Sequence, residues 1–257
     1  MSSARLELRE VDKSLGGVEV LAGLSLHVEA GEFVSLLGPS GAGKSTALKL
    51  LIGELGADGG EVLSDGKPVS GRSARFGFMP QRDALMPWRS VIDNAILSLE
   101  VAGVKRAVAR QRVRPLIDEF GLSGFEMHYP SQLSGGMRQR VALLRTVVHA
   151  RDMLLLDEPF GALDALTRTE MQRWLESRWL QHHWTALLIT HDVREAVFLS
   201  DRIYVLSARP ARVICEITVP LPRPRHSDSL ATQQAAAIET RVLDLLLNPI
   251  VSQRTAP

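Results

Sequence analysis

The sequence predicts an α/β fold with a mostly parallel sheet, an antiparallel β-subdomain at the N-terminus and an inserted all-helical subdomain. Three observations predict it. Residues 5–37 are strand-like, residues 91–120 carry apolar side chains at helical spacing, and short apolar strands alternate with helical segments from residue 153 onward. The chain of 257 residues is long enough for one large domain or two small ones.

Composition narrows the classes of protein that fit. The chain is 45% hydrophobic and 23% charged with a formal net charge of +1, so it lacks the basic excess of a nucleic-acid-binding protein. Cys215 is the single cysteine, which excludes an intramolecular disulfide. The first ten residues lack the apolar core of a signal peptide, and no apolar stretch is long enough to span a membrane. We expect no nucleic-acid partner, and any membrane role to depend on another protein.

The N-terminal region predicts strands. Residues 6–11 and 24–29 alternate apolar and polar side chains, as strands with one buried face do. A hairpin turn is expected at residues 30–31, leading into the apolar run 33–37, which predicts a buried strand.

A glycine loop follows that strand and precedes a helical segment at residues 47–52. It has the pattern G-x-x-x-x-G-K-[ST] between a strand and a helix, the context in which backbone N–H groups and a helix N-terminus bind nucleotide phosphates. Lys44 would reach the β- and γ-phosphates, and the Ser45 hydroxyl would bind Mg²⁺. The fold is therefore predicted to have a P-loop NTPase core. The predicted phosphate-binding residues are Gly38, Pro39, Ser40, Gly41, Ala42, Gly43, Lys44, Ser45 and Thr46.

The middle of the chain predicts two short strands and then the helical insert. Residues 59–63 and 76–79 are strand-like, and residues 91–101 and 104–120 have helical spacing. A further helix is expected from residue 137 to about residue 149.

Alternating strands and helices follow the insert. Residues 153–156 and 186–189 are continuous apolar strands, and helices are expected at residues 166–182 and through residue 197. Strand-like stretches at 202–206 and 213–219 come next. Pro220, Pro222 and Pro224 indicate a linker, and the tail at 229–247 has helical content.

Polar side chains stand directly after the predicted parallel strands, at the edge where α/β sheets bind ligands. Asp157 is placed to hold Mg²⁺, and Glu158 to orient and polarise an attacking water, which favours hydrolysis over simple binding. His191 ends the next strand and could contact the γ-phosphate or hold the catalytic carboxylate. The amide oxygen of Gln81 could ligate Mg²⁺ or hold the lytic water. Taken alone, each of these side chains is compatible with a purely structural role, and a lone histidine at a strand end is more often structural than functional.

Several short motifs occur together in one order: residues 38–46, Gln81, residues 133–137, residues 153–159, residues 162–164 and His191. In order and spacing they resemble the Walker A, Q-loop, signature, Walker B, D-loop and switch histidine of ATP-binding-cassette (ABC) ATPases. The signature discriminates most, since other glycine-loop families lack it. The resemblance covers about residues 6–219, and we expect an ABC ATPase domain at 1–222 with a helical insert at about 84–150 and a helical tail at 223–257.

The resemblance implies a homodimer that binds two ATP molecules with Mg²⁺. Each ATP would lie between the glycine loop of one subunit and Ser134, Gly135 and Gly136 of the other. Ser134 is also a good N-cap for the helix that follows, and the two roles are compatible.

Residues 79–91 resemble the Q-loop region of importer ATPases, especially the nitrate, sulfonate and taurine branch. In that family a membrane permease docks there, and Arg82, Leu85, Met86 and Trp88 would line an apolar groove. The alternative is that Trp88 packs inside the helical insert. Arg138, Arg140 and Arg145 are expected to form surface ion pairs.

Two positions depart from the family pattern. Leu15 stands where an aromatic residue usually stacks on adenine, so base selectivity is expected to be looser. Met137 replaces the commoner glutamine of the signature and lacks its hydrogen bonds. Neither departure implies a loss of activity, because Lys44, Asp157, Glu158 and His191 are all present.

The resemblance therefore implies an ATP-hydrolysing subunit of an importer, peripheral on the cytoplasmic face of the membrane, that works with a permease and indirectly with an extracytoplasmic substrate-binding protein. One alternative is a soluble ABC ATPase without a transporter. Another is a monomeric glycine-loop kinase, which would transfer phosphate to a small molecule.

Overall fold

The computed structural model describes residues 5–69, 71, 76–148 and 153–248 of the chain. The predicted helix end at residue 149, the predicted insert end at residue 150 and the last residues of the tail, 249–257, lie outside this part. The chain forms two compact units. The first unit comprises Met1–Ala74 and Gln172–Pro257, and the second comprises Arg75–Met171.

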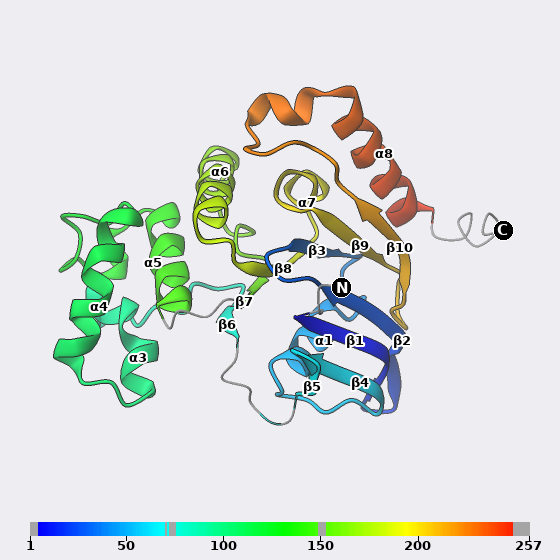
Figure 1. Cartoon of the computed structure of the whole chain (residues 1–257), viewed down its shortest axis with the longest axis horizontal. Coiled ribbons are helices and arrows are strands. Elements are labelled where there is room, and N and C mark those ends of the chain that lie inside the picture. The colour runs from blue at the N-terminus through cyan, green and yellow to red at the C-terminus, as the bar shows by residue number, and fades with distance from the viewer. Residues whose placement is uncertain (1–4, 70, 72–75, 149–152, 249–257) are drawn as a thin grey trace. The chain divides into compact units, whose positions relative to one another are not determined.

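The first unit contains an antiparallel sheet in the order β2-β1-β4-β5. Its strands are β1 (Leu6–Leu15), β2 (Val18–Val28), β4 (Gly59–Ser64) and β5 (Lys67–Pro68). Alternate residues of β1, such as Leu6 and Leu8, are fully buried, which confirms the predicted one-sided strands. This sheet is the predicted antiparallel N-terminal β-subdomain (Figure 1).

A second group of strands in the first unit is mostly parallel. β3 (Phe33–Leu37) pairs in parallel with β8 (Thr185–Thr190) and β9 (Arg202–Leu206), and β10 (Val213–Thr218) pairs antiparallel with β9. All residues of β3 and β8 are buried, which is why both read as continuous apolar runs. Helix α1 (Lys44–Leu51) follows β3, and α7 (Val193–Leu199) follows β8.

The C-terminal helix of the first unit packs against the other elements of that unit. After the 3₁₀ helix η2 (Ser227–Ala231), α8 (Gln233–Leu247) lies beside α7 over β9 and β10 (Figure 1). Ala235 and Val242 of α8 are fully buried in one core with Leu37 and Val197. The tail therefore adds to the core of this unit.

The proline segment between β10 and η2 was predicted as a linker, and here the structure differs. The guanidinium of Arg225, which is 1% exposed, donates to the carbonyls of Val197, Phe198 and Ser200 at the end of α7 and to those of Val219 and Leu221. Burial lowers the pKa of Arg225 to about 10. One side chain thus satisfies the last carbonyls of a helix and fixes the segment that follows β10.

The second unit contains a strand pair and the helical insert. β6 (Gly77–Met79) runs parallel to β7 (Met153–Asp157). The helices are α2 (Val91–Ala95), α3 (Leu97–Val101), α4 (Arg106–Glu119), the 3₁₀ helix η1 (Pro130–Gln132) and α5 (Gly135–Val147). The predicted helix at 91–101 is divided at Ile96 into two short helices. Helix α6 (Ala165–His182) begins in this unit and ends in the first.

Candidate functional site

The glycine loop of the first unit lies between β3 and α1, as its sequence context predicts. The N–H of Ala42 donates to the carbonyl oxygen of Pro39 over 3.2 Å, which closes a turn through Ser40 and Gly41. Gly41 has φ +76°, a backbone conformation that the third position of such a turn requires and that glycine adopts at little cost.

Two glycines of the loop are needed because other chain segments approach closely. A Cβ atom on Gly43, which has φ +119°, would lie 2.9 Å from Leu21 Cδ2 and 3.2 Å from the carbonyl oxygen of Val20. A Cβ atom on Gly38 would lie 2.9 Å from Leu206 Cβ. The loop therefore rests directly on β2 and β9, and any larger residue at either position would displace it.

Lys44 is the first residue of α1 and is 7% exposed. Its Nζ donates to the carbonyl oxygens of Gly38 over 2.7 Å and of Pro39 over 3.0 Å. These bonds hold the ammonium group at the loop itself, where a phosphate group would need it. Ser45 is exposed and Thr46 is buried.

Two further predicted residues lie in the first unit at strand ends. Leu15 ends β1, pairs with Val18 across the turn, and is 40% exposed, so an apolar side chain is accessible there. His191 follows β8 directly and is exposed. The next residue, Asp192, caps α7 by accepting the N–H of Glu195, so His191 lies at a fixed strand-to-helix junction.

In the second unit, the structure brings two of the predicted catalytic side chains together. Gln81 follows β6 and Glu158 follows β7, and Gln81 Nε2 donates to Glu158 Oε2 over 3.0 Å. A carboxylate accepts but cannot donate, so the amide nitrogen faces Glu158 and leaves the amide oxygen available as an acceptor. Glu158 has φ +43°, a conformation that is uncommon for a residue other than glycine. Asp157 ends β7 and is half-buried.

The signature segment also lies in the second unit. Ser134 is the N-cap of α5, and its hydroxyl accepts the N–H of Met137, so the predicted capping is confirmed and the helix begins two residues earlier than predicted. A Cβ atom on Gly136 would lie 3.0 Å from Thr167 Cγ2. Ser134 itself is exposed at this helix N-terminus. It is therefore accessible to an anion as well as to its own helix.

The D-loop carboxylate Asp164 stands before α6. The backbone N–H of Thr167 donates to it over 3.0 Å, and this hydrogen bond lowers the pKa of Asp164. The carboxylate is thus held ionised at the start of a helix.

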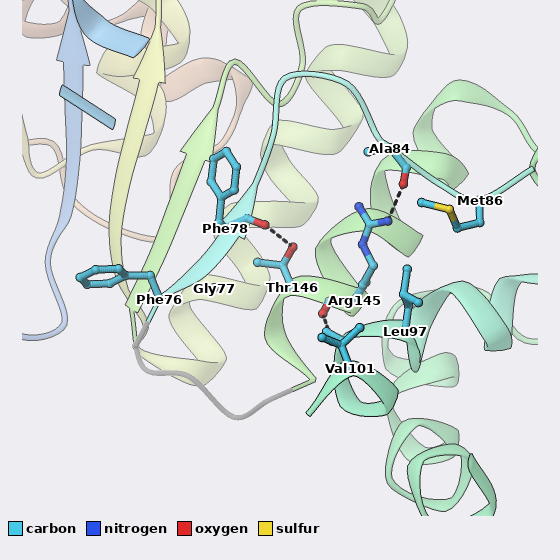
Figure 2. Close-up of a pocket in the computed structure, with 10 residues that line it drawn as sticks. Phe76, Gly77, Phe78, Ala84, Met86, Leu97, Val101, Arg145 and Thr146 are labelled. Carbon is cyan, nitrogen blue, oxygen red and sulfur yellow. Dashed lines mark hydrogen bonds between the residues drawn. The ribbon is translucent and has the colours of Figure 1, made fainter. Parts of the chain in front are cut away.

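A pocket of about 470 Å³ opens in the second unit between β6, the segment after Gln81, α3 and α5. Figure 2 shows Phe78, Met86, Leu97 and Val101 around it, with Arg145 reaching across to Ala84. Of the four residues predicted to line an apolar groove here, Met86 does so. Arg82, Leu85 and Trp88 are not in the lining: Leu85 is 9% exposed because it packs inward, and Trp88 is 72% exposed outside the pocket. Trp88 is therefore not packed inside the insert.

Two residues that sequence reasoning did not connect with this pocket shape it. Asn94, fully buried on α2, accepts the N–H of Met86 and donates to the carbonyls of Met86, Arg89 and Ser90. Arg145 donates to the carbonyl oxygens of Asp83 over 2.6 Å and Ala84 over 2.7 Å, so the surface ion pair predicted for it is wrong. Burial lowers the pKa of Arg145. The sequence signal available for Asn94 was a polar residue within the predicted helix at 91–101, since a polar side chain that becomes buried needs hydrogen-bond partners.

The residues predicted to bind Mg²⁺ offer oxygen donors. These are the exposed Ser45 hydroxyl, the Gln81 amide oxygen and the Asp157 carboxylate, and oxygen is the ligand that Mg²⁺ prefers. Within the described residues no group of three or more His, Cys, Asp or Glu side chains could hold a metal by itself. Each of these donors is of the kind that a hard cation such as Mg²⁺ binds.

Comparisons with known proteins identify the family of the chain. The family described as "ABC transporter" matches residues 21–161. The chain is 44% identical over 243 residues to the aliphatic sulfonates import ATP-binding protein SsuB of Pseudomonas fluorescens, covering 95% of this chain and 87% of that protein. It is also 44% identical over 254 residues to SsuB 2 of Agrobacterium fabrum, covering 99% and 92%.

Solved structures give the same result at the level of the fold. CbiO1 of Clostridium perfringens, part of the ABC transporter complex CbiONQ, matches with a TM-score of 0.77 at 23% identity over 98% of both chains. The dimeric structure of MJ0796, a bacterial ABC transporter cassette, matches with a TM-score of 0.71 at 29% identity, covering 83% of this chain and 98% of that one. Among the described residues, no helix is long and apolar enough to cross a membrane. The chain therefore belongs to the ABC transporter family, as a cassette that binds and hydrolyses ATP.

Proposed function

We propose that the chain is the ATPase subunit of an importer for a small solute of the aliphatic sulfonate class, closing as a homodimer on two ATP molecules at the cytoplasmic face of the membrane. Relatives 43–44% identical over nearly the whole chain are named as aliphatic sulfonate import proteins, which supports this solute class over nitrate or taurine. The dimeric cassette structure supports the homodimer.

The observation that carries the catalytic proposal is the hydrogen bond between Gln81 and Glu158. It fixes the carboxylate at the end of β7, the position from which it would orient and polarise water. Lys44 and the loop N–H groups stabilise negative charge on the phosphates, and His191 supports the γ-phosphate. Ser45, Gln81 and Asp157 are the residues that would hold Mg²⁺, and the bound ion would neutralise further charge on the phosphates.

The nucleotide site is completed by a second copy. The exposed Ser134 with Gly135 and Gly136 presents a capped helix N-terminus that would face the γ-phosphate bound by the partner's glycine loop. Leu15 covers the base by apolar contact.

The permease docks, in this proposal, at the pocket of the second unit. Its lining is mostly apolar, it is open to solvent, and Asn94 and Arg145 hold the segment 83–90 that forms one wall. A helix with an apolar face is the kind of partner that such a pocket accepts. Transport would then couple to dimer closure and reopening, with a substrate-binding protein delivering the solute from outside.

Glu158→Gln tests the catalytic assignment. The amide keeps the size of the side chain but cannot polarise water, so ATP binding is expected to persist while turnover falls by a factor of 100 or more, roughly the loss expected for a key electrostatic group. Glu61→Gln makes the same change on an exposed strand residue and serves as the control. An undiminished hydrolysis rate in Glu158→Gln would refute the role of Glu158.

The same variant tests the shared site. ATP should shift Glu158→Gln from monomer to dimer in size-exclusion chromatography, and Gly135→Arg added to it should abolish the shift. A variant that stays monomeric with ATP and passes phosphate to a small molecule would favour a kinase.

Uptake of ethanesulfonate by vesicles holding the chain and its permease tests the solute. A chain that purifies without any membrane protein would favour the soluble alternative.

A further inference from the structure

The turn between β9 and β10, residues 207–212, lies directly against the glycine loop although it is far away in the sequence. Arg209 donates from its NH2 group to the carbonyl oxygen of Gly41 over 2.9 Å, across 168 residues of chain. Leu206, the last residue of β9 directly before the turn, is the residue that a Cβ on Gly38 would meet at 2.9 Å. The loop is therefore contacted at its base by the end of β9 and at its tip by the turn.

The turn is itself firmly held. The N–H of Ser207 donates to Arg212 O over 2.9 Å, and the Ser207 hydroxyl accepts the N–H of Arg212 and donates to Pro210 O. Ala211 is joined to β2, because its N–H donates to Val20 O and its carbonyl accepts the N–H of Ala22. Since Val20 is also the residue against which Gly43 packs, the turn, β2 and the loop share one support. Arg209 is thus presented from a rigid base.

The bond from Arg209 acts on a peptide group that already has a second restraint. In the peptide that joins Gly41 to Ala42, the carbonyl oxygen accepts from Arg209 and the N–H donates to Pro39 O. That same Pro39 oxygen accepts from Lys44 Nζ over 3.0 Å. A chain of hydrogen bonds therefore runs from Arg209 through one peptide plane to the lysine that meets the phosphates.

Without Arg209, the hydrogen bond from the Ala42 N–H to Pro39 O would still oppose a rotation of this peptide, but its carbonyl oxygen would no longer be held. Gly41 is a glycine with positive φ, and nothing lies within 4 Å of the position of a Cβ atom. Neither its own backbone nor its surroundings therefore prevent other backbone conformations at this residue. Rotation would break the Pro39–Ala42 turn and alter the direction of the loop N–H groups, which bind phosphate only when they converge. Binding would then include the cost of reordering the loop.

We propose that Arg209 is a positioning residue for ATP binding, which holds the tip of the glycine loop in its phosphate-binding conformation through the Gly41 carbonyl. It acts through the backbone and does not touch the reacting atoms. Its effect should therefore appear in nucleotide affinity and not in the rate of the chemical step.

Arg209→Ala tests the proposal, with Arg209→Lys and Arg212→Ala beside it. Arg212 is also an exposed arginine of the same turn, so its variant removes the same charge without removing the bond to Gly41. We expect Arg209→Ala to raise the Kd of a fluorescent ATP analogue and the KM for ATP about fivefold, the typical effect of losing one hydrogen bond, while kcat stays within about twofold. Arg209→Lys should recover part of the affinity.

Wild-type affinity in Arg209→Ala would overturn the proposal, as would an equal loss in Arg212→Ala, which would assign the effect to net charge. A fall in kcat with unchanged KM would also overturn it. Thermal melting without nucleotide checks the fold of each variant. If Arg209→Ala lowers the melting temperature while Arg209→Lys restores it without restoring affinity, the arginine is only structural.

Discussion

The glycine loop of the first unit and the apolar pocket of the second differ in how they are built. The loop is one continuous segment, residues 38–46, whose own N–H and carbonyl groups close its turn and hold the Lys44 ammonium group. The pocket takes its walls from β6, the segment after Gln81, α3 and α5, and depends on the side chains of Asn94 and Arg145 for its shape.

This difference has a functional consequence. A phosphate group is small and always the same, so backbone groups in a fixed local conformation suffice to bind it. A protein partner presents an apolar surface of its own shape, and matching it requires side chains gathered from several elements. Substitutions should therefore affect the two sites in different measurable quantities.

The largest effect is expected at the loop. Lys44→Ala removes the ammonium group that the Gly38 and Pro39 carbonyls hold in place, and ATP hydrolysis should fall by about 100-fold or more. Steady-state hydrolysis and ATP titration measure it. Lys49→Ala is the matched control, because Lys49 is an exposed lysine of the same helix that pairs with Glu54. If both variants lost activity equally, the loop would not be the phosphate site.

A second effect concerns the wall of the pocket. Asn94→Ala leaves the N–H of Met86 and three carbonyls of the segment 86–90 without their partner, and the free energy of unfolding should fall by about 2–4 kcal/mol. Thermal or urea unfolding measures it. The exposed hydroxyl of Ser123 donates to Asp118, and Ser123→Ala should change stability by less than about 0.5 kcal/mol. Equal small changes would show that the wall does not depend on Asn94.

A third test concerns the pocket surface. Met86→Glu places a carboxylate in a mostly apolar lining, so capture of the permease by the purified chain should weaken by about tenfold, or 1.4 kcal/mol. Pull-down with solubilised permease measures it, after melting confirms the fold. Val108→Glu makes the same change at an exposed apolar residue of α4 outside the lining. Undisturbed capture by Met86→Glu would remove the pocket from the docking surface.

The smallest effect is a pH dependence in the second unit. Burial of Asp93 opposes ionisation, but the hydrogen bonds and charges of Arg110 and Arg106, at 2.7 and 2.5 Å, lower the pKa of Asp93 below its ordinary value. A carboxyl group with a lowered pKa in the folded state stabilises the fold above its unfolded pKa of about 3.9 and loses this effect as the pH falls through the folded value.

Asp93→Asn should therefore destabilise the protein by about 1 kcal/mol at pH 7, with the difference shrinking below about pH 4. Urea unfolding at pH 7, 5 and 3 measures it. Between pH 7 and 5 the difference should be constant. A difference that instead grew on acidification would contradict the assigned direction of the shift.

Much of the candidate site was predictable because its signals are local. A buried strand reads as an apolar run, a phosphate loop needs glycine at fixed positions, and Ser134 caps the helix that begins next to it. Polar residues after strands, such as Gln81 and Glu158, were predicted to lie at the edge of the sheet where ligands bind. The structure adds that β6 and β7 pair in parallel and that these two side chains share a hydrogen bond.

What the sequence by itself determined is the glycine loop, the order of the motifs and the family to which the chain belongs. Tertiary structure alone decided which polar side chains support them: Arg209 on Gly41, Arg145 on Ala84, and Arg225 on the end of α7. Each of these arginines donates to backbone carbonyls, which every residue carries and no sequence pattern marks. Such partners become known only when folding brings together segments that are distant in the chain.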